Sequence, residues 1–436
     1  MKLFDLSLKM NGFAIDKAKQ VLSEIETINE DDFLAYVESR KTEILQFHLE
    51  HNSFYKSFGK SINLENWKSV PVMTKAHLQQ PISKRLSKGY NLKNVYLNKT
   101  SGSSGKPFIF AKDKWCHAMT WAEITNRFSW YNIDFNTSKQ ARFYGIPLNK
   151  KNYYKERLKD WFSKRYRFSV FDLSDTAFKK AVKKFKTTAF DYINGYTSSL
   201  VQFAKYLERE NILLTTVCPS LKVCITTSEM LFEDDKILME KQFGVPVVNE
   251  YGASELDLIA FENRKGEWQV NSETLFVEIL DEDDNVLPLE KEGRIVITSL
   301  YNKAHPFIRY DIGDVGILSK SSTLKKPILK KLIGRTNDVI LLPSGKKAAG
   351  LTFYYITKSV IQDDGNVSEF VIEQHKVDEF KIIYVSNQTL SKDKTRTIKA
   401  EVIKYLEPQL AITFKRVKTL NRSKSGKLKQ FTSYIN

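Results

Sequence analysis

The sequence has little cysteine, proline and glycine for its length. Among 436 residues there are three cysteines, 11 prolines and 18 glycines. So few glycines and prolines exclude collagen-like and low-complexity chains. Cys116, Cys218 and Cys224 form neither a CxxC pair nor the spacing of a secreted disulfide framework. We therefore expect them to be reduced core residues of a cytoplasmic protein.

Long hydrophobic runs are also absent. Residues 1–6 lack the uninterrupted apolar region of a signal peptide. No stretch approaches the roughly 20 apolar residues of a membrane span, so we expect a soluble protein. Apolar residues nevertheless make up 42% of the chain, with 28 Phe, 20 Tyr and 6 Trp, which excludes a wholly disordered chain. The length suits two or three domains of about 100–200 residues each.

Acidic residues are too few to balance the basic ones. The chain has 68 Lys+Arg and 51 Asp+Glu, a formal charge of +17 with His neutral. Residues 139–186 hold 15 basic and 4 acidic residues, and residues 376–436 hold 14 and 5. Trp161, Tyr166 and Phe168 stand among the first of these clusters, and aromatic rings among cations can stack nucleic-acid bases. A nucleic-acid-binding protein is therefore one alternative.

The same cluster has a simpler interpretation as a solvated helix. Its apolar residues have the spacing of a helix that faces a core, and its lysines then fall on the opposite face. The apolar set is Phe178, Ala181, Val182 and Phe185, and the basic set is Lys179, Lys180, Lys183 and Lys184. We favour this interpretation over nucleic-acid binding. Peripheral contact with an anionic membrane or an anionic glycan is a third alternative.

The order of expected elements predicts an α/β fold. Residues 14–58 read as two helices, the second of which continues to Gly59. Helices and short apolar strands then alternate, which favours a largely parallel sheet. The expected helices are 113–131, 176–187, 197–210 and 232–243, and the strands 142–146, 221–226 and 245–249. Residues 267–318 are β-rich, and a small α+β domain follows a boundary near Gly334.

The loop from Thr100 to Pro107, with the sequence TSGSSGKP, is the most informative single motif. Its hydroxyl groups, its two glycines and Lys106 supply donors and positive charge for a polyphosphate. It is not a Walker A loop, because Lys106 is followed by Pro107 and not by Ser or Thr. A Ser/Gly-rich loop on its own is more often a flexible connection.

Four more segments follow in a fixed order. They are Tyr251–Glu255, Arg309–Asp314, Gly334–Asp338 and Arg422–Lys427. Glu255 places a carboxylate on a turn, where it could bind Mg²⁺. Asp314 follows a glycine and could accept both ribose hydroxyls. Each segment alone is commonly a turn or a solvated loop, but five in this order are hard to attribute to chance.

With these five segments the chain resembles the adenylate-forming superfamily, which includes acyl-CoA synthetases, luciferases and nonribosomal peptide adenylation domains. The resemblance covers nearly the whole chain. Residues 51–55, 71–75 and 308–314 are most similar to the phenylacetate-CoA ligase group. Within it, they are most similar to the branch of capsular-polysaccharide biosynthesis proteins and synthetases that adenylylate a coenzyme.

The resemblance implies an enzyme that activates a carboxylate with ATP and Mg²⁺. Acyl-AMP forms, pyrophosphate leaves, and the acyl group passes to an acceptor. Coenzyme A is the usual acceptor, but residues 342–348 lack the glycine and the Ile-Glu pair of a thioester-forming tunnel. The acceptor therefore stays open between a thiol, an amine and a sugar, and the AMP conjugate itself is a further alternative product.

The resemblance also assigns residues and domains. Glu255 would bind Mg²⁺, Arg335 would assist Asp314, and Lys427 would bridge the substrate carboxylate and the α-phosphate. The residues that would contact ATP are Thr100, Ser101, Gly102, Ser103, Ser104, Gly105, Lys106, Ser228, Tyr251, Gly252, Ser254, Asp314 and Arg335. The expected domains are 1–333 with a helical lead-in over 1–60 and a β-rich subdomain over 267–330, a hinge over 334–338 that contains Asn337, and a mobile lid over 339–436.

Physical chemistry gives Lys427 a reason for its role. Attack of a carboxylate on the α-phosphate brings two anions together and builds charge on the equatorial oxygens. Fixed cations and N–H dipoles lower the barrier of such a reaction.

Overall fold

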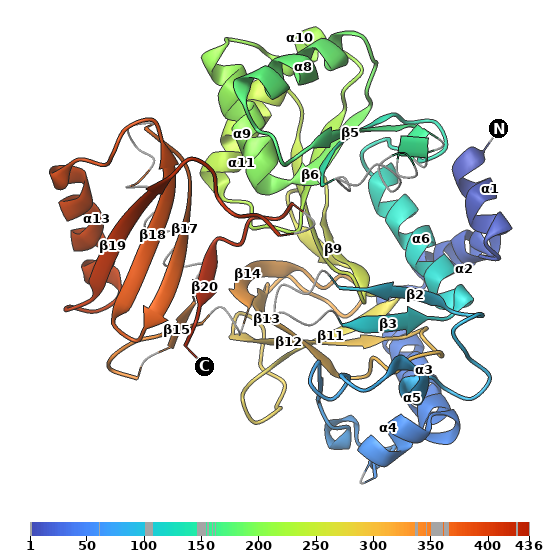
Figure 1. The fold of residues 1–436 in the computed structure, drawn as a ribbon. Helices are drawn as coiled ribbons and strands as arrows, with labels where there is room; N and C mark the ends of the chain where they lie inside the picture. Colours follow the sequence, from blue (N-terminus) through green and yellow to red (C-terminus); the bar gives the residue numbers. More distant parts are fainter. Residues whose placement is uncertain are drawn as a thin grey trace. The chain divides into compact units, whose positions relative to one another are not determined.

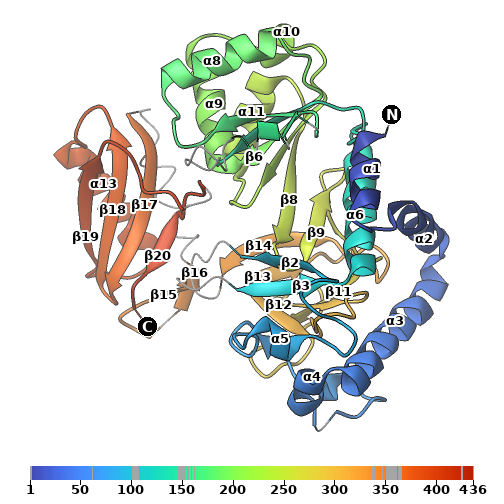
Figure 2. The same cartoon turned by 45° about the vertical axis from the view of Figure 1, so that its right-hand side comes forward.

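The computed structural model describes most of the chain in two units (Figures 1 and 2). The described residues are 2–60, 62–100, 108–145, 154, 157–158, 160–161, 163–335, 339–345, 347–349, 361, 366–423 and 426–435. The first unit comprises Met1–Ile312, Leu318–Lys330 and Lys424–Gly426. The second comprises Gly313–Ile317, Lys331–Ser423 and Lys427–Asn436.

The first unit begins with four helices. They are α1 (Leu3–Met10), α2 (Ile15–Thr27), α3 (Glu30–His51) and α4 (Ser53–Phe58). The expectation of one continuous helix up to Gly59 is wrong, because the helix breaks at Asn52. The Asn52 side chain accepts a hydrogen bond from Tyr55 N at 2.9 Å and donates to Arg85 O and Ser87 Oγ at 2.8 and 3.0 Å. A buried asparagine that caps the next helix thus ends α3.

A seven-stranded sheet forms the centre of the first unit. Its strands follow the order β10-β9-β8-β7-β6-β4-β5, with parallel pairing from β5 to β8 and antiparallel pairing beyond β8. The prediction of a largely parallel sheet is confirmed. The strands are β4 (Gln140–Tyr144), β5 (Arg165–Ser169), β6 (Tyr192–Tyr196), β7 (Val223–Thr227), β8 (Val247–Ala253), β9 (Asp257–Glu262) and β10 (Trp268–Val270).

Helices cover both faces of this sheet, so its central strands are apolar on both sides. Ile193 of β6 packs with α8, α9 and α11, whereas its neighbour Tyr192 packs with Phe128 of α6 on the other face. All five residues of β6 and of β7 are buried. The helices are α6 (Lys114–Ser129), α8 (Asp175–Lys186), α9 (Thr197–Arg209), α10 (Leu214–Val217) and α11 (Glu233–Phe243).

Two sequence expectations about side chains hold in this core. Phe178, Ala181, Val182 and Phe185 of α8 are buried, whereas Lys179, Lys180 and Lys183 are exposed, as the expectation of a solvated basic face requires. Lys184, the fourth lysine of that set, is half-buried over the Tyr166 ring. Cys116, Cys218 and Cys224 are free and buried, as expected of core residues.

The β-rich part is a second sheet. It has the order β1-β13-β12-β11, and β14 pairs with β13. Its strands are β1 (Met73–Thr74), β11 (Leu275–Leu280), β12 (Glu292–Ser299), β13 (Tyr310–Leu318) and β14 (Leu329–Arg335). A separate hairpin pairs β2 (Tyr96–Lys99) with β3 (Ile109–Lys112). The short elements η1 (Trp67–Ser69) and α5 (Ile82–Arg85) lie between α4 and this hairpin in the chain.

The second unit is the small α+β domain that the sequence predicts. Its four-stranded sheet has the order β19-β18-β17-β20, and α13 lies along the sheet (Figures 1 and 2). Ile398 and Val402 of α13 are buried. The elements are β15 (Val339–Leu341), β16 (Lys347–Ala349), β17 (Val367–Lys376), β18 (Glu379–Ser386), α13 (Lys392–Tyr405), β19 (Ala411–Val417) and β20 (Phe431–Ser433). The expected fold class, a large α/β part with a smaller α+β domain, is confirmed.

Within the part of the chain that the structure describes, none of the helices combines the length and hydrophobicity that a membrane-spanning helix needs.

Candidate functional site

The predicted phosphate loop connects the two strands of the β2–β3 hairpin. Lys99 pairs with Ile109 in the hairpin register. Thr100 N donates to Phe108 O at 2.9 Å, and Phe108 N donates to Thr100 Oγ1 at 3.0 Å. Thr100 and Phe108 therefore close the base of the loop. A threonine hydroxyl that accepts one hydrogen bond can still donate another, so Thr100 can hold the loop and contact a ligand.

The other residues predicted for this loop lie outside the described residues. They are Ser101, Gly102, Ser103, Ser104, Gly105 and Lys106.

The segment from Tyr251 to Asp257 forms the turn between β8 and β9. Tyr251 is buried and meets the Trp268 ring edge to face, with 5.8 Å between centroids. Gly252 is fixed by close packing, because a Cβ atom there would lie 2.4 Å from Asp257 O. Asp257 has a left-handed backbone with φ 57°. The turn leaves Ser254 exposed and buries Glu255.

Glu255 is the carboxylate that this turn holds in place. Its side chain is only 6% exposed, and its Oε1 accepts a hydrogen bond from the Tyr310 hydroxyl at 3.0 Å. A single carboxylate combined with phosphate oxygens is a usual set of ligands for Mg²⁺. Among the described residues no group of three or more His, Cys, Asp or Glu side chains could hold a metal ion. The donor set therefore fits a metal shared between Glu255 and a nucleotide.

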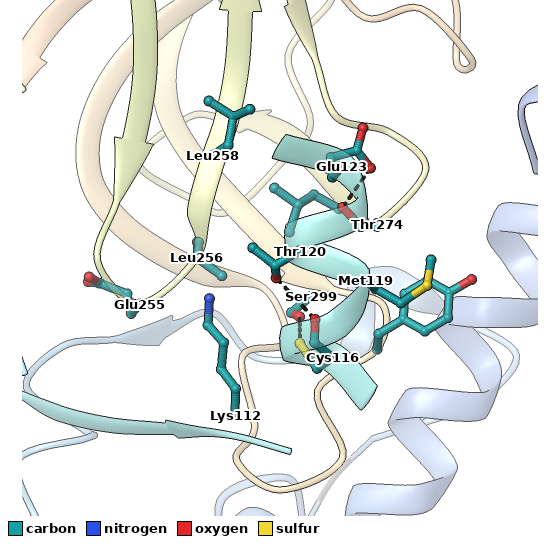
Figure 3. Close-up of a pocket in the computed structure, with 12 residues that line it drawn as sticks. Lys112, Cys116, Met119, Thr120, Glu123, Glu255, Leu256, Leu258, Thr274 and Ser299 are labelled. Atoms are coloured by element: carbon teal, nitrogen blue, oxygen red, sulfur yellow. Dashed lines mark hydrogen bonds between the residues drawn. The ribbon is translucent and has the colours of Figure 1, made fainter. Parts of the chain in front are cut away.

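A small cavity lies beside Glu255 (Figure 3). Its volume is about 20 Å³, which is room for about one water molecule. Its lining residues include Lys112, Thr120, Glu123, Glu255, Thr274 and Ser299. Burial raises the pKa of Glu123, and the buried Arg127 guanidinium, 2.5 Å from its Oε1, opposes that shift. Arg127 also contacts Glu273 at 2.6 Å.

Ser228 lies next to the Tyr251 turn at the edge of the sheet. It follows the last residue of β7, Thr227, which pairs with Glu250 of β8. Ser228 is exposed and has φ 69°. Glu229 closes the start of α9, because its Oε2 accepts from Ser198 N at 2.7 Å and its carbonyl accepts from Thr197 Oγ1 at 3.2 Å. Ser228 and the Tyr251 turn thus lie at the carboxyl ends of the parallel strands β7 and β8, where open α/β sheets bind ligands.

Sequence reasoning missed a polar cluster at this same edge. Thr227 Oγ1 donates to Glu250 Oε1 at 2.9 Å. Burial raises the pKa of Glu250, while the bond from Thr227 and the charge of Arg142 lower it. Arg142 stacks over the Tyr144 ring at 4.1 Å, and Tyr144 lies 4.4 Å from the Tyr196 ring. The one sequence signal is that Glu250 directly precedes the Tyr251 motif.

Asp314 and Arg335 lie on paired strands. Asp314 is buried on β13, one residue after Gly313, whose φ is 81°. Arg335 is the last residue of β14. Its side chain is not among the side chains that the structure describes. Asn337, the expected hinge residue, is not among the described residues.

Lys427 belongs to the second unit and is hydrogen-bonded to Ser423. Its backbone N donates to Ser423 Oγ at 3.0 Å, and its carbonyl accepts from Ser423 N at 2.9 Å. Gly426 before it has φ 88°, a left-handed conformation that favours glycine. Nearby, Arg422 pairs with Glu369 of β17. This pair ties the residue before Ser423 to the sheet of the second unit.

No family model matches the chain. Two curated proteins resemble it in sequence. It is 25% identical over 411 residues to Protein CapK of Staphylococcus aureus, an alignment that covers 91% of this chain and 86% of that protein. It is 29% identical over 131 residues to phenylacetate-coenzyme A ligase of Aromatoleum evansii, 28% of this chain and 29% of that enzyme.

The fold also matches solved structures. The crystal structure of 2-hydroxyisobutyryl-CoA ligase in the postadenylation state, in complex with R3-HIB-AMP, aligns with a TM-score of 0.70 at 14% identity. The alignment covers 93% of this chain and 90% of that one. The fold is thus that of the adenylate-forming ligases. With the sequence relatives, it confirms the resemblance to that superfamily and to its phenylacetate-CoA ligase-like group.

Proposed function

We propose that the protein is an ATP-dependent ligase that activates a carboxylate as acyl-AMP, releases pyrophosphate and transfers the acyl group to an acceptor. The observation that carries the proposal is the β8–β9 turn. It buries Glu255 against Tyr310 and lies beside Ser228 at the carboxyl edge of the parallel strands. Such an edge is the usual ligand site of an open α/β sheet.

The described residues suit the parts of an ATP site. The hairpin closed by Thr100 and Phe108 presents the predicted phosphate loop. Gly252 lets the backbone of the turn pass close to Asp257, and Tyr251 offers a ring for adenine. Asp314 would accept the ribose hydroxyls with assistance from Arg335. The ammonium of Lys427 would join the substrate carboxylate to the α-phosphate.

Mg²⁺, held by Glu255 and phosphate oxygens, would neutralise negative charge on the leaving pyrophosphate. The protein itself contributes to metal binding by positioning the Glu255 carboxylate. The Tyr310 hydroxyl donates to Oε1 and fixes the plane of the carboxylate.

Pyrophosphate exchange tests the proposal. Purified protein should incorporate labelled pyrophosphate into ATP when Mg²⁺ and the correct acid from a broad carboxylate panel are present. Binding of ATP with Mg²⁺, measured by calorimetry in the same preparation, is the companion measurement. A folded protein that neither binds the nucleotide nor exchanges pyrophosphate with any acid contradicts the proposal.

The acceptor is a separate proposal. The resemblance to the capsular-polysaccharide branch and the departures at residues 342–348 favour transfer to an amine or a sugar in polysaccharide biosynthesis. A coenzyme A ligase of the phenylacetate type is the alternative. Mass spectrometry of the products with and without coenzyme A separates the two. An acyl-CoA product supports the alternative, and an unchanged acyl-AMP indicates a different acceptor.

A second proposal concerns the basic surface near β5, which we infer to contact an anionic membrane. Tyr154, Leu158 and Trp161 are 69%, 58% and 73% exposed, at the i, i+4, i+7 spacing of one helical face. Arg157 and Lys184 both lie over the Tyr166 ring, at 5.2 and 4.9 Å, so this apolar face adjoins the lysines of α8. Exposed aromatic rings beside lysines suit the interface of an anionic bilayer.

Liposome co-sedimentation tests this surface. Binding should require anionic lipid and should weaken when Lys179, Lys180 and Lys183 are replaced by glutamate. An anionic glycan and unrelated RNA or DNA are the comparison ligands. Equal binding to neutral vesicles, or a preference for nucleic acid at about 0.1 M salt, contradicts the membrane proposal.

A further inference from the structure

An ion pair with a buried lysine lies next to the proposed magnesium ligand. Lys112, the last residue of β3, pairs through its Nζ with Asp257 Oδ2 at the start of β9. The Lys112 side chain is only 3% exposed and that of Asp257 is 25% exposed. Figure 3 shows Lys112 pointing toward the turn that carries Glu255. The pair therefore sets the charge beside Glu255.

We propose that Asp257 is a positioning residue for magnesium binding, because it holds the ammonium of Lys112 and so keeps the carboxylate of Glu255 available for Mg²⁺. The inference rests on the proposed function, in which Glu255 binds the metal. It adds a residue that touches neither the metal nor the nucleotide.

The ammonium of Lys112 has few alternatives to Asp257. A buried charge is costly without a partner, so this ammonium must stay paired. The cavity that Lys112 lines is also lined by two carboxylates, Glu123 and Glu255. Glu123 is already paired with Arg127 at 2.5 Å. Of the carboxylates that line this cavity, Glu255 is then the one left for Lys112 when the charge of Asp257 is removed, and the lysine competes there with Mg²⁺.

The position of Asp257 is fixed by the backbone around it. Its φ of 57° is left-handed, a conformation that aspartate and asparagine tolerate better than most residues. Its carbonyl packs against Gly252 at the opposite side of the hairpin. Lys112 and Glu255 line the same cavity of about 20 Å³, so the lysine end borders open space that Glu255 also borders. Asp257→Asn therefore removes the charge and keeps both the shape and the backbone preference of the residue.

The experiment measures metal affinity without turnover. Mn²⁺ binding to the protein saturated with α,β-methylene ATP is followed by electron paramagnetic resonance, with melting temperatures measured in parallel. Asp257→Asn should weaken Mn²⁺ binding on the order of tenfold, the usual effect of losing a residue that supports a metal ligand. The double variant Lys112→Met/Asp257→Asn should return to within about threefold of wild type, because the competing cation is gone.

A merely structural tie between β3 and β9 gives a different result. The two variants would then lose Mn²⁺ affinity equally, which overturns the inference, as does wild-type affinity in Asp257→Asn. If Asp257→Asn fails to fold, the double variant replaces a charged pair by neutral groups and keeps the comparison with wild type. A double variant that binds tenfold more weakly then overturns the inference.

The wild-type protein separates this inference from the proposed function. If the wild type shows no nucleotide-dependent Mn²⁺ binding and no pyrophosphate exchange, the proposed function and the inference both fail. If the wild type shows both but Asp257→Asn matches it, the inference alone fails.

Discussion

Of the residues assigned here, Lys427 is the one on which the rate of adenylation should depend most. Its ammonium would contact two anions in the transition state, and removing a positioned charge of this kind costs about 3 kcal/mol, or roughly a hundredfold in rate. Lys427→Ala should therefore reduce pyrophosphate exchange about a hundredfold while ATP binding changes little. The control is Lys429→Ala, an exposed lysine two residues further on. Full exchange activity in Lys427→Ala rules out the assignment.

Gly252 is a residue whose role depends on shape. A Cβ atom there would lie 2.4 Å from Asp257 O, a backbone atom that cannot move aside cheaply. Gly252→Ala should open the turn that carries Glu255, cost about 1–3 kcal/mol of unfolding free energy and weaken binding of ATP with Mg²⁺.

Gly266→Ala is the matched control for that substitution. Gly266 has φ 76° but its Cβ would meet only a Glu262 side-chain oxygen at 3.9 Å. It should lose about 1 kcal/mol of stability from backbone strain and keep its nucleotide affinity, as measured by urea unfolding and calorimetry. Equal nucleotide affinity in both variants would mean that the turn is not part of the site.

At the scale of elements, the break between α3 and α4 is set by one buried side chain. Asn52 makes three hydrogen bonds that join the helix start to Arg85 and Ser87. Asn52→Ala should lower the unfolding free energy by about 2–3 kcal/mol, because a cap is lost and buried groups lose partners. Asn66→Ala, an exposed cap of η1, should cost about 1 kcal/mol or less. Chemical unfolding compares the two, and equal losses contradict this account.

Hydrophobic period predicts the long helices around the first sheet, and its failures have physical causes. The ranges expected for α6, α8, α9 and α11 lie within about two residues of the observed helices, because each has a repeating apolar face. The sequence does not predict β5, since Arg165 and Arg167 interrupt its apolar pattern. Those arginines pair with Asp160 at 2.6 and 3.0 Å, which partly neutralises their charge beside the sheet.

At the scale of the whole molecule, buried histidines link stability to pH. Burial lowers the pKa of His48 and of His117 from 6.5 to about 4, and burial also lowers the pKa of His305. Between pH 4 and 6.5 the unfolded chain then binds more protons than the folded one. Stability from these neutral histidines is complete above pH 6.5 and is lost as the pH falls toward 4, by up to about 1.4 kcal/mol per pH unit for each histidine.

His48 offers a direct measurement of that dependence. Its Nε2 meets Asn302 O at 2.8 Å and its Nδ1 meets Ser87 Oγ at 3.2 Å. His48→Gln removes the titration and keeps a side chain that can both donate and accept. The slope of unfolding free energy against pH, from urea titrations between pH 5 and 6.5, should be smaller in the variant. An unchanged slope would show that His48 does not titrate as described.

Sequence motifs identify some residues of the candidate site, whereas others come together only through the fold. The motifs around Thr100, Tyr251, Asp314 and Lys427 could be found because each is a short run with its own turn chemistry. The cluster of Arg142, Tyr144, Tyr196, Thr227 and Glu250 could not, because its members come from four strands. Their side chains meet only because the parallel strands end at one edge of the sheet.

The sequence by itself determined the fold class, the order of the elements and the motifs that resemble an adenylate-forming ligase. Those features depend on the spacing of apolar residues and on turn residues, both of which act over a few positions. Only the tertiary structure decided which polar side chains meet: Lys112 with Asp257, 145 residues away, and Glu255 with Tyr310, 55 residues away. Pairs so distant along the chain depend on strand order and register, and no local pattern of residues specifies either.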